Sequence, residues 1–210
     1  MIRHHPSDAT VLACAAGRLP VLHTRVLAVH LSACPHCHGE LRRLEEIGGA
    51  LLEDLPPSAL RPDALSRTLA RLGEAVAAPE PPAVPDTLEA PVTLDALAVG
   101  RWWWLAPGIR LMPLHRRDAS LTRLDLIRVA PGVAMPGHGH TGLETACILQ
   151  GGYVDETGEY AAYDIAESDG DLDHAPVASP GPDCICLTAT TGRLRGHTWL
   201  SRLVQPLIGV

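Results

Sequence analysis

A proline-rich stretch divides this sequence into two parts and so limits what it can fold into. Residues 79–91 have the sequence PEPPAVPDTLEAP, which contains five prolines. Proline lacks an N–H donor and is excluded from helix interiors and central strands, so the stretch predicts a stiff linker. A chain of 210 residues is long enough for two small domains. We therefore expect one domain in residues 1–78 and a second in residues 92–210.

The part before the linker has the spacing of short helices. Ser7 can cap a first helix that ends at Gly17, an apolar segment follows Pro20, and Pro35 suits the first turn of a third helix. A fourth helix can begin at Pro62. Its apolar residues recur at intervals of four, three and four, which suits either a core or a groove for a protein partner. These residues are Leu65, Leu69, Leu72 and Val76.

A cluster of metal-ligand residues lies within this helical part. His30, Cys34 and Cys37 form the pattern H-x3-C-x2-C, which is typical of zinc sites. Either His4 or His5 can supply a fourth ligand. A site filled by two cysteines and two histidines is closed and structural, and it would stabilise a module whose own core is small. A redox dithiol is the alternative, but no βαβ pattern surrounds these residues.

The part after the linker has the pattern of short antiparallel strands. Glycines and prolines, single and in pairs, interrupt this part repeatedly, and alternating runs such as LTRLDLIRVA and CICLTAT lie between them. We expect an all-β sandwich or barrel.

A second group of metal-ligand residues lies in this β part. Residues 132–151 fit G-x5-H-x-H-x3-E-x6-G, which is the first cupin motif, so we expect a cupin barrel. His138 and His140 share one face of a strand, Glu144 follows a turn, and His174 is our candidate for a fourth ligand. The site favours zinc, and iron, manganese and nickel also suit these ligands. A cupin that has lost its metal is the alternative interpretation.

Two further thiols lie on one predicted strand. Cys184 and Cys186 are separated by one residue, so both face the same side. They are either buried thiols of the barrel or a redox pair.

Charge and sequence ends exclude several classes of function. The net charge is −7 and all 17 basic residues are arginines, so non-specific binding to nucleic acid is disfavoured. The N-terminus has no signal-peptide pattern and no stretch of about 18 apolar residues exists, so we expect no membrane partner. Six cysteines without a leader fit thiols better than disulfides. We expect a cytoplasmic protein.

Three segments resemble the ChrR-type zinc-binding anti-sigma family. They are the H-x3-C-x2-C segment, the opening IRHHPSDATVLACAAG and the glycine pair in EEIGGALLED. The resemblance implies His5, with His30, Cys34 and Cys37, as zinc ligands. It also implies a helical domain that sequesters an extracytoplasmic-function (ECF) sigma factor, and a C-terminal cupin whose metal is held by three histidines and one glutamate. The implied signal is singlet oxygen or related peroxides, or a small molecule, acting at the cupin. The alternative is a dioxygenase-like cupin enzyme with a zinc-binding helical appendage.

Overall fold

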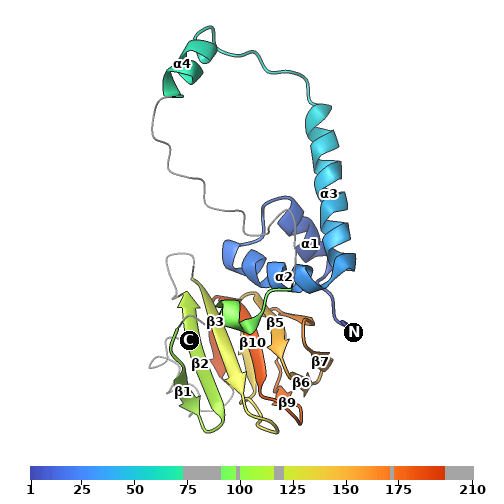
Figure 1. The fold of residues 1–210 in the computed structure, drawn as a ribbon, viewed down its shortest axis with the longest axis vertical. Helices are drawn as coiled ribbons and strands as arrows, with labels where there is room; N and C mark the ends of the chain where they lie inside the picture. The colour runs from blue at the N-terminus through green and yellow to red at the C-terminus, as the bar shows by residue number, and fades with distance from the viewer. Residues whose placement is uncertain (73–90, 98–99, 116–120, 171–172, 197–210) are drawn as a thin grey trace.

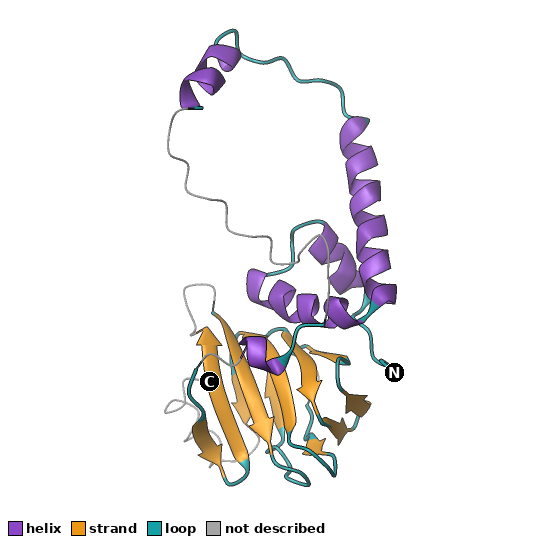
Figure 2. Ribbon diagram, in the orientation of Figure 1, coloured by secondary structure: helices purple, strands orange, loops and turns teal. Residues whose placement is uncertain are grey.

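The structure is a computed structural model that describes residues 1–72, 91–97, 100–115, 121–170 and 173–196. Helices come first and strands follow, which confirms the predicted fold class (Figures 1 and 2). The described helices are α1 (Asp8–Ala15), α2 (Val21–Ala33), α3 (Pro35–Glu53), α4 (Ala64–Arg71) and α5 (Leu94–Leu97). We call residues 1–72 the helical module and residues 100–196 the β domain. Residues 79–90 of the predicted linker lie outside the described residues.

The β domain is built from three antiparallel sheets. The largest has the order β1-β2-β3-β10-β5-β8, and smaller sheets have the orders β7-β6-β9 and β11-β4. The strands are β1 (Trp103–Ala106), β2 (Ile109–His115), β3 (Thr122–Val129), β4 (His138–His140), β5 (Glu144–Gln150), β6 (Gly152–Asp155), β7 (Gly158–Ala161), β8 (Ile165–Ser168), β9 (Val177–Ala178), β10 (Cys184–Thr191) and β11 (Leu194–Gly196).

The predicted helix boundaries follow from local capping. Ser7 caps α1, where its side chain accepts a hydrogen bond from the backbone N–H of Thr10 at 3.3 Å. Gly17 follows α1 with φ of 63°, a left-handed conformation that suits glycine. Pro35 begins α3 directly after the short break at Cys34. The break brings the H-x3-C-x2-C residues to the junction of α2 and α3.

Helix α2 lies between the rest of the helical module and the large sheet (Figure 1). Leu22, Val26 and Val29 pack on the outer face of that sheet, in one core cluster with residues of β3, β5 and β10. Leu27 and Leu31 point the other way, into the core of the helical module. A helix that is apolar on both sides is expected to be buried on both sides, as α2 is. The two parts of the chain therefore share a core.

Helix α4 stands apart from this packed body. It lies beyond the far end of α3, and none of its residues is buried (Figure 1). Three of the four predicted helices of the module thus pack together, and the fourth does not. Leu65, Leu69 and Leu72 of the predicted apolar stripe are exposed, and Val76 lies outside the described residues. No helix among the described residues is long and apolar enough to cross a membrane.

Candidate metal centres

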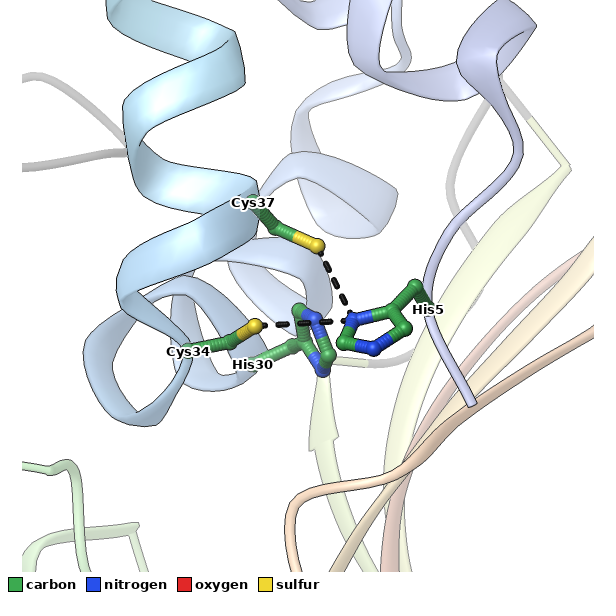
Figure 3. Close-up of side chains that lie close together, drawn as sticks. All are labelled: His5, His30, Cys34 and Cys37. Atoms are coloured by element: carbon green, nitrogen blue, oxygen red, sulfur yellow. Dashed lines mark hydrogen bonds between the residues drawn. The ribbon is translucent and has the colours of Figure 1, made fainter. Parts of the chain in front are cut away.

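The four predicted ligands of the helical module converge on one point, as Figure 3 shows. We call His5, His30, Cys34 and Cys37 the cysteine cluster. Their ligand atoms lie within 4.8 Å of one another. The Nδ1 atom of His5 lies 3.2 Å from Sγ of Cys37 and 3.5 Å from Sγ of Cys34. Typical zinc–sulfur and zinc–nitrogen bond lengths place tetrahedral neighbours about 3.5 Å apart, so these side chains suit a four-coordinate zinc ion.

The chemistry of the cysteine cluster also suits a cation. Nε2 of His30 is buried and has no hydrogen-bond partner. Burial lowers the pKa of His30, against the opposing effect of its hydrogen bond to Tyr163, so the ring is neutral and offers a lone pair. Burial and the contact with Cys34 raise the pKa of the Cys37 thiol to about 12. Metal binding here therefore displaces a proton, which is the usual behaviour of a cysteine site.

The structure distinguishes His5 from His4, which spacing alone does not. The His4 ring stacks on Tyr160 with the ring centres 4.1 Å apart. Its Nε2 is 3.0 Å from the backbone oxygen of Glu159, to which it can donate a hydrogen bond. His4 therefore faces the β domain, and His5 faces the cysteine cluster.

The predicted ligands of the β domain form a second group. His138 and His140 come from β4, Glu144 begins β5, and His174 forms an isolated bridge with His138. Their ligand atoms also lie within 4.8 Å of one another. We call these four residues the histidine–glutamate cluster. It contains no cysteine, so its three histidines and one glutamate would hold a cation through nitrogen and oxygen atoms alone.

Neighbouring groups orient three of the four ligands of the histidine–glutamate cluster, namely His138, His174 and Glu144. Nδ1 of His138 lies 2.9 Å from the backbone oxygen of Pro136, and Nδ1 of His174 lies 3.1 Å from a carboxylate oxygen of Asp155. Each Nδ1 can donate there, which leaves Nε2 free for a metal, and Nε2 of His174 is indeed buried without a partner. The side-chain hydroxyl of Thr190 donates a hydrogen bond to a carboxylate oxygen of Glu144 at 3.0 Å.

Burial controls the charge of this second cluster. It lowers the pKa of His140 to about 4, with a further contribution from His174, so the ring is neutral near pH 7. Both ring nitrogens of His140 are buried without a hydrogen-bond partner. Burial also raises the pKa of Glu144, an effect that the neighbouring histidines oppose. Neutral imidazoles beside a desolvated carboxyl group are a favourable setting for a divalent cation.

The two thiols predicted on one strand lie close together inside the β domain. Sγ of Cys184 and Sγ of Cys186 are 3.7 Å apart, and both cysteines are free. The contact between them raises the pKa of Cys186, and burial opposes ionisation of both thiols. The geometry brings the two sulfur atoms together, as both interpretations of this pair require.

Two polar residues that the sequence analysis did not single out connect the helical module to the β domain. His23 of α2 is fully buried, and its ring nitrogens lie 2.9 Å from the hydroxyls of Thr145 and Thr191. Asp164 is also fully buried and binds the N-terminal segment. The only signal for His23 is a polar residue in an otherwise apolar helix, and nothing in the pattern around Asp164 marks it.

Comparisons with known proteins agree with this arrangement. Residues 93–193 match the family of ChrR cupin-like domains. The anti-sigma-E factor ChrR of Cereibacter sphaeroides is 40% identical over 215 residues, which cover 100% of this chain and 99% of that protein. In the crystal structure of Rhodobacter sphaeroides SigE in complex with the anti-sigma ChrR, a chain 40% identical matches with a TM-score of 0.71, covering 90% of this chain and 99% of that chain.

Another solved structure is more distant. A putative acetylacetone dioxygenase of Methylibium petroleiphilum PM1 is 17% identical with a TM-score of 0.44, covering 55% of this chain and 85% of that chain.

Proposed function

The chain belongs to the family of ChrR anti-sigma factors, and on this premise we propose that its helical module binds and sequesters a sigma factor of the ECF class. The relative that matches over the whole chain, the anti-sigma-E factor ChrR, is a regulator. This chain is therefore grouped with regulators and not with cupin enzymes. Support for the partner comes from the related complex, in which SigE is bound to ChrR.

The observation that carries this proposal is an apolar surface that none of the described residues covers. On α4, Leu65 is 72% exposed, Leu69 is 55% exposed and Leu72 is 77% exposed. The second half of α3 adds further exposed leucines, Leu51 and Leu52. Apolar side chains gathered on one helix in this way are typical of a surface that binds a protein partner.

The position of α4 explains why these leucines can serve a partner. None of its residues is buried against the other described residues, so packing within the described part of the chain stabilises this helix little. Burial of a leucine side chain contributes about 1.5–3 kcal/mol, and three such residues can stabilise a complex strongly. We propose that α4 and the end of α3 contact the sigma factor from two sides.

Binding can be tested with the cognate sigma factor and the double variant Leu65→Asp/Leu69→Asp. We expect its affinity for the sigma factor to fall at least 100-fold, since two charges would replace two buried leucines. The matched control is Arg67→Ala, which replaces an exposed residue two positions from both leucines and so on the opposite side of the same helix. Equal affinities of the double variant and the wild type in a titration would contradict the proposal.

We further propose that the cysteine cluster holds zinc and that the histidine–glutamate cluster holds a second divalent metal. Zinc supplies the helical module with a four-point cross-link when bound, and His5, His30, Cys34 and Cys37 are its ligands. In the β domain zinc is favoured, and iron, manganese and nickel suit the same residues. Support comes from the converging ligand atoms and from the buried ring nitrogens that lack any other partner.

The β domain is proposed to make sigma release responsive to singlet oxygen or peroxides. Cys184 and Cys186 are a candidate redox pair beside the second cluster. With an organic peroxide, their thiols would lose two protons and two electrons and form an S–S bond, while the peroxide is reduced to an alcohol and water. A change there can release the sigma factor only if it alters how the β domain packs on α2.

We also propose limits for the two domains and a cellular location for the protein. We assign residues 1–78 to sigma binding, residues 79–91 to the linker and residues 92–210 to the cupin. A protein that keeps a sigma factor from RNA polymerase works in the cytoplasm, where transcription takes place. No contact with nucleic acid is needed for this role.

A further inference from the structure

Both histidines of the cysteine cluster are held in place by the β domain. The ring of His30 comes from α2, and its Nδ1 donates a hydrogen bond of 2.7 Å to the backbone oxygen of Tyr163. This contact fixes which nitrogen carries the proton, so Nε2 points toward the cluster with its lone pair free (Figure 3). A backbone oxygen commonly orients a ligand histidine in this way. Here the oxygen belongs to the β domain, whereas the ligands belong to the helical module.

His5 is held from the same short segment of the β domain. The backbone N–H groups of Arg3 and His4 both donate to Oδ1 of Asp164, at 2.6 Å and 3.0 Å. The N–H of Ile165 donates in turn to the backbone oxygen of His4 at 3.3 Å. The residues directly before His5 are therefore bound to the β domain by three hydrogen bonds.

The segment that makes these contacts, residues 161–165, is itself rigidly held. Tyr163 has φ of 67°, a left-handed conformation that is rare for a bulky residue and persists only where its surroundings impose it. The N–H of Tyr163 donates to the backbone oxygen of Ile148 at 2.7 Å. The N–H of Ile148 donates in turn to the backbone oxygen of Asp164 at 3.1 Å. The N–H of Ala161 donates to Oδ2 of Asp164 at 2.9 Å. We call residues 161–165 the support loop.

We propose that the support loop positions the two histidine ligands of the cysteine cluster, so that zinc binding in the helical module and docking of the β domain strengthen each other. Asp164 and Tyr163 are positioning residues in this proposal, since neither contributes a ligand atom. Outer partners of metal ligands typically change metal affinity by about 10- to 100-fold. Thermodynamic coupling between two binding events is reciprocal. If docking of the β domain raises the affinity for zinc, bound zinc must strengthen the docking of the β domain by the same factor. The inference rests on the metal site proposed above.

The test is the metal affinity of the cysteine cluster in the full chain. Cobalt(II) replaces zinc and gives a sulfur-to-metal charge-transfer band only when cysteine is a ligand, so the band reports on this cluster. We expect Asp164→Ala to weaken cobalt and zinc binding at least 10-fold in competition with a chelator. Asp164→Asn keeps one acceptor oxygen and should lose less. The control Glu159→Gln removes only an exposed ion pair with Arg3 and should bind as the wild type does.

The outcomes separate this inference from the metal site on which it rests. If the wild type gives no band that depends on Cys34 and Cys37, the metal site itself is wrong. If the wild type gives the band and Asp164→Ala binds cobalt as tightly, the support loop has no role.

A second measurement applies even where the alanine variant fails to fold. Cys37→Ser removes a zinc ligand of α3 and leaves the hydrogen bonds of the support loop in place, and we expect it to speed hydrogen exchange at the N–H of Ile165, which donates to the backbone oxygen of His4. His138→Ala, which lacks a ligand of the other cluster, should leave that exchange unchanged. Unchanged exchange in Cys37→Ser would overturn the inference.

Discussion

The two ligand clusters of this chain are built in opposite ways. The histidine–glutamate cluster is oriented from within its own domain, by the backbone of Pro136 and the side chains of Asp155 and Thr190. The cysteine cluster takes its ligands from the helical module and its supporting hydrogen bonds from the β domain. One site can therefore form in an isolated domain, whereas the other depends on how the two parts of the chain pack. From this contrast we propose that the histidine–glutamate cluster carries the response to the oxidant. The cysteine cluster then couples the helical module to the β domain.

The largest effect is expected from breaking the cysteine cluster. Cys34→Ser should abolish zinc binding there and destabilise the helical module, since structural zinc contributes on the order of 10 kcal/mol to small zinc domains. His138→Ala should lose only the metal of the β domain and keep the helices folded. Thermal unfolding followed by circular dichroism, with metal content per chain, measures both. Equal melting of Cys34→Ser and the wild type would contradict a structural role.

A second experiment breaks the histidine–glutamate cluster and measures the response. Glu144→Gln keeps the shape of the side chain but removes the charge that a divalent cation needs. We expect the variant to bind the sigma factor within about twofold of the wild type, and to release it much less when singlet oxygen is generated in solution. Release at the wild-type rate would remove this cluster from the response.

The smallest effect is expected from the buried histidine between the two parts. Burial lowers the pKa of His23 to about 4, from about 6.5 in the unfolded chain. The unfolded state therefore binds the extra proton first, and stability from the neutral ring is lost as the pH falls from about 6.5 toward 4.

At pH 6 this loss is about 1 kcal/mol. His23→Gln retains a donor and an acceptor but does not titrate in this range. Urea unfolding at pH 7 and pH 6 should therefore show a steeper loss for the wild type than for the variant. Parallel losses in the two chains would mean that His23 does not titrate on unfolding.

Much of the local structure follows from the sequence because its causes are local. Ser7 and Pro35 begin helices where capping predicts them, and the strands occur where glycine and proline alternate with apolar runs. The three-residue and two-residue spacings of H-x3-C-x2-C and H-x-H place ligands one helical turn or one strand repeat apart. Spacing of this kind identified both clusters, and the family resemblance selected His5, which the structure also places there.

Long-range contacts lie beyond what such patterns predict. The periodicity of Leu65, Leu69 and Leu72 suited a core as well as a binding surface, and only the packing leaves these side chains exposed. The linker pattern predicted two parts but not that α2 would lie against the large sheet. The partners that His23 and Asp164 have in the other part of the chain are more than a hundred residues away, so no local pattern predicts these contacts.

By itself, the sequence predicted the order of helices and strands and the local ligand patterns H-x3-C-x2-C and H-x-H-x3-E, since these depend on neighbours within a turn or a strand. The tertiary structure decided that the ligands of one set are held by hydrogen bonds from the other part of the chain. The reason is physical: a buried imidazole or carboxylate needs a hydrogen-bond partner, and the fold supplied those partners from the opposite domain.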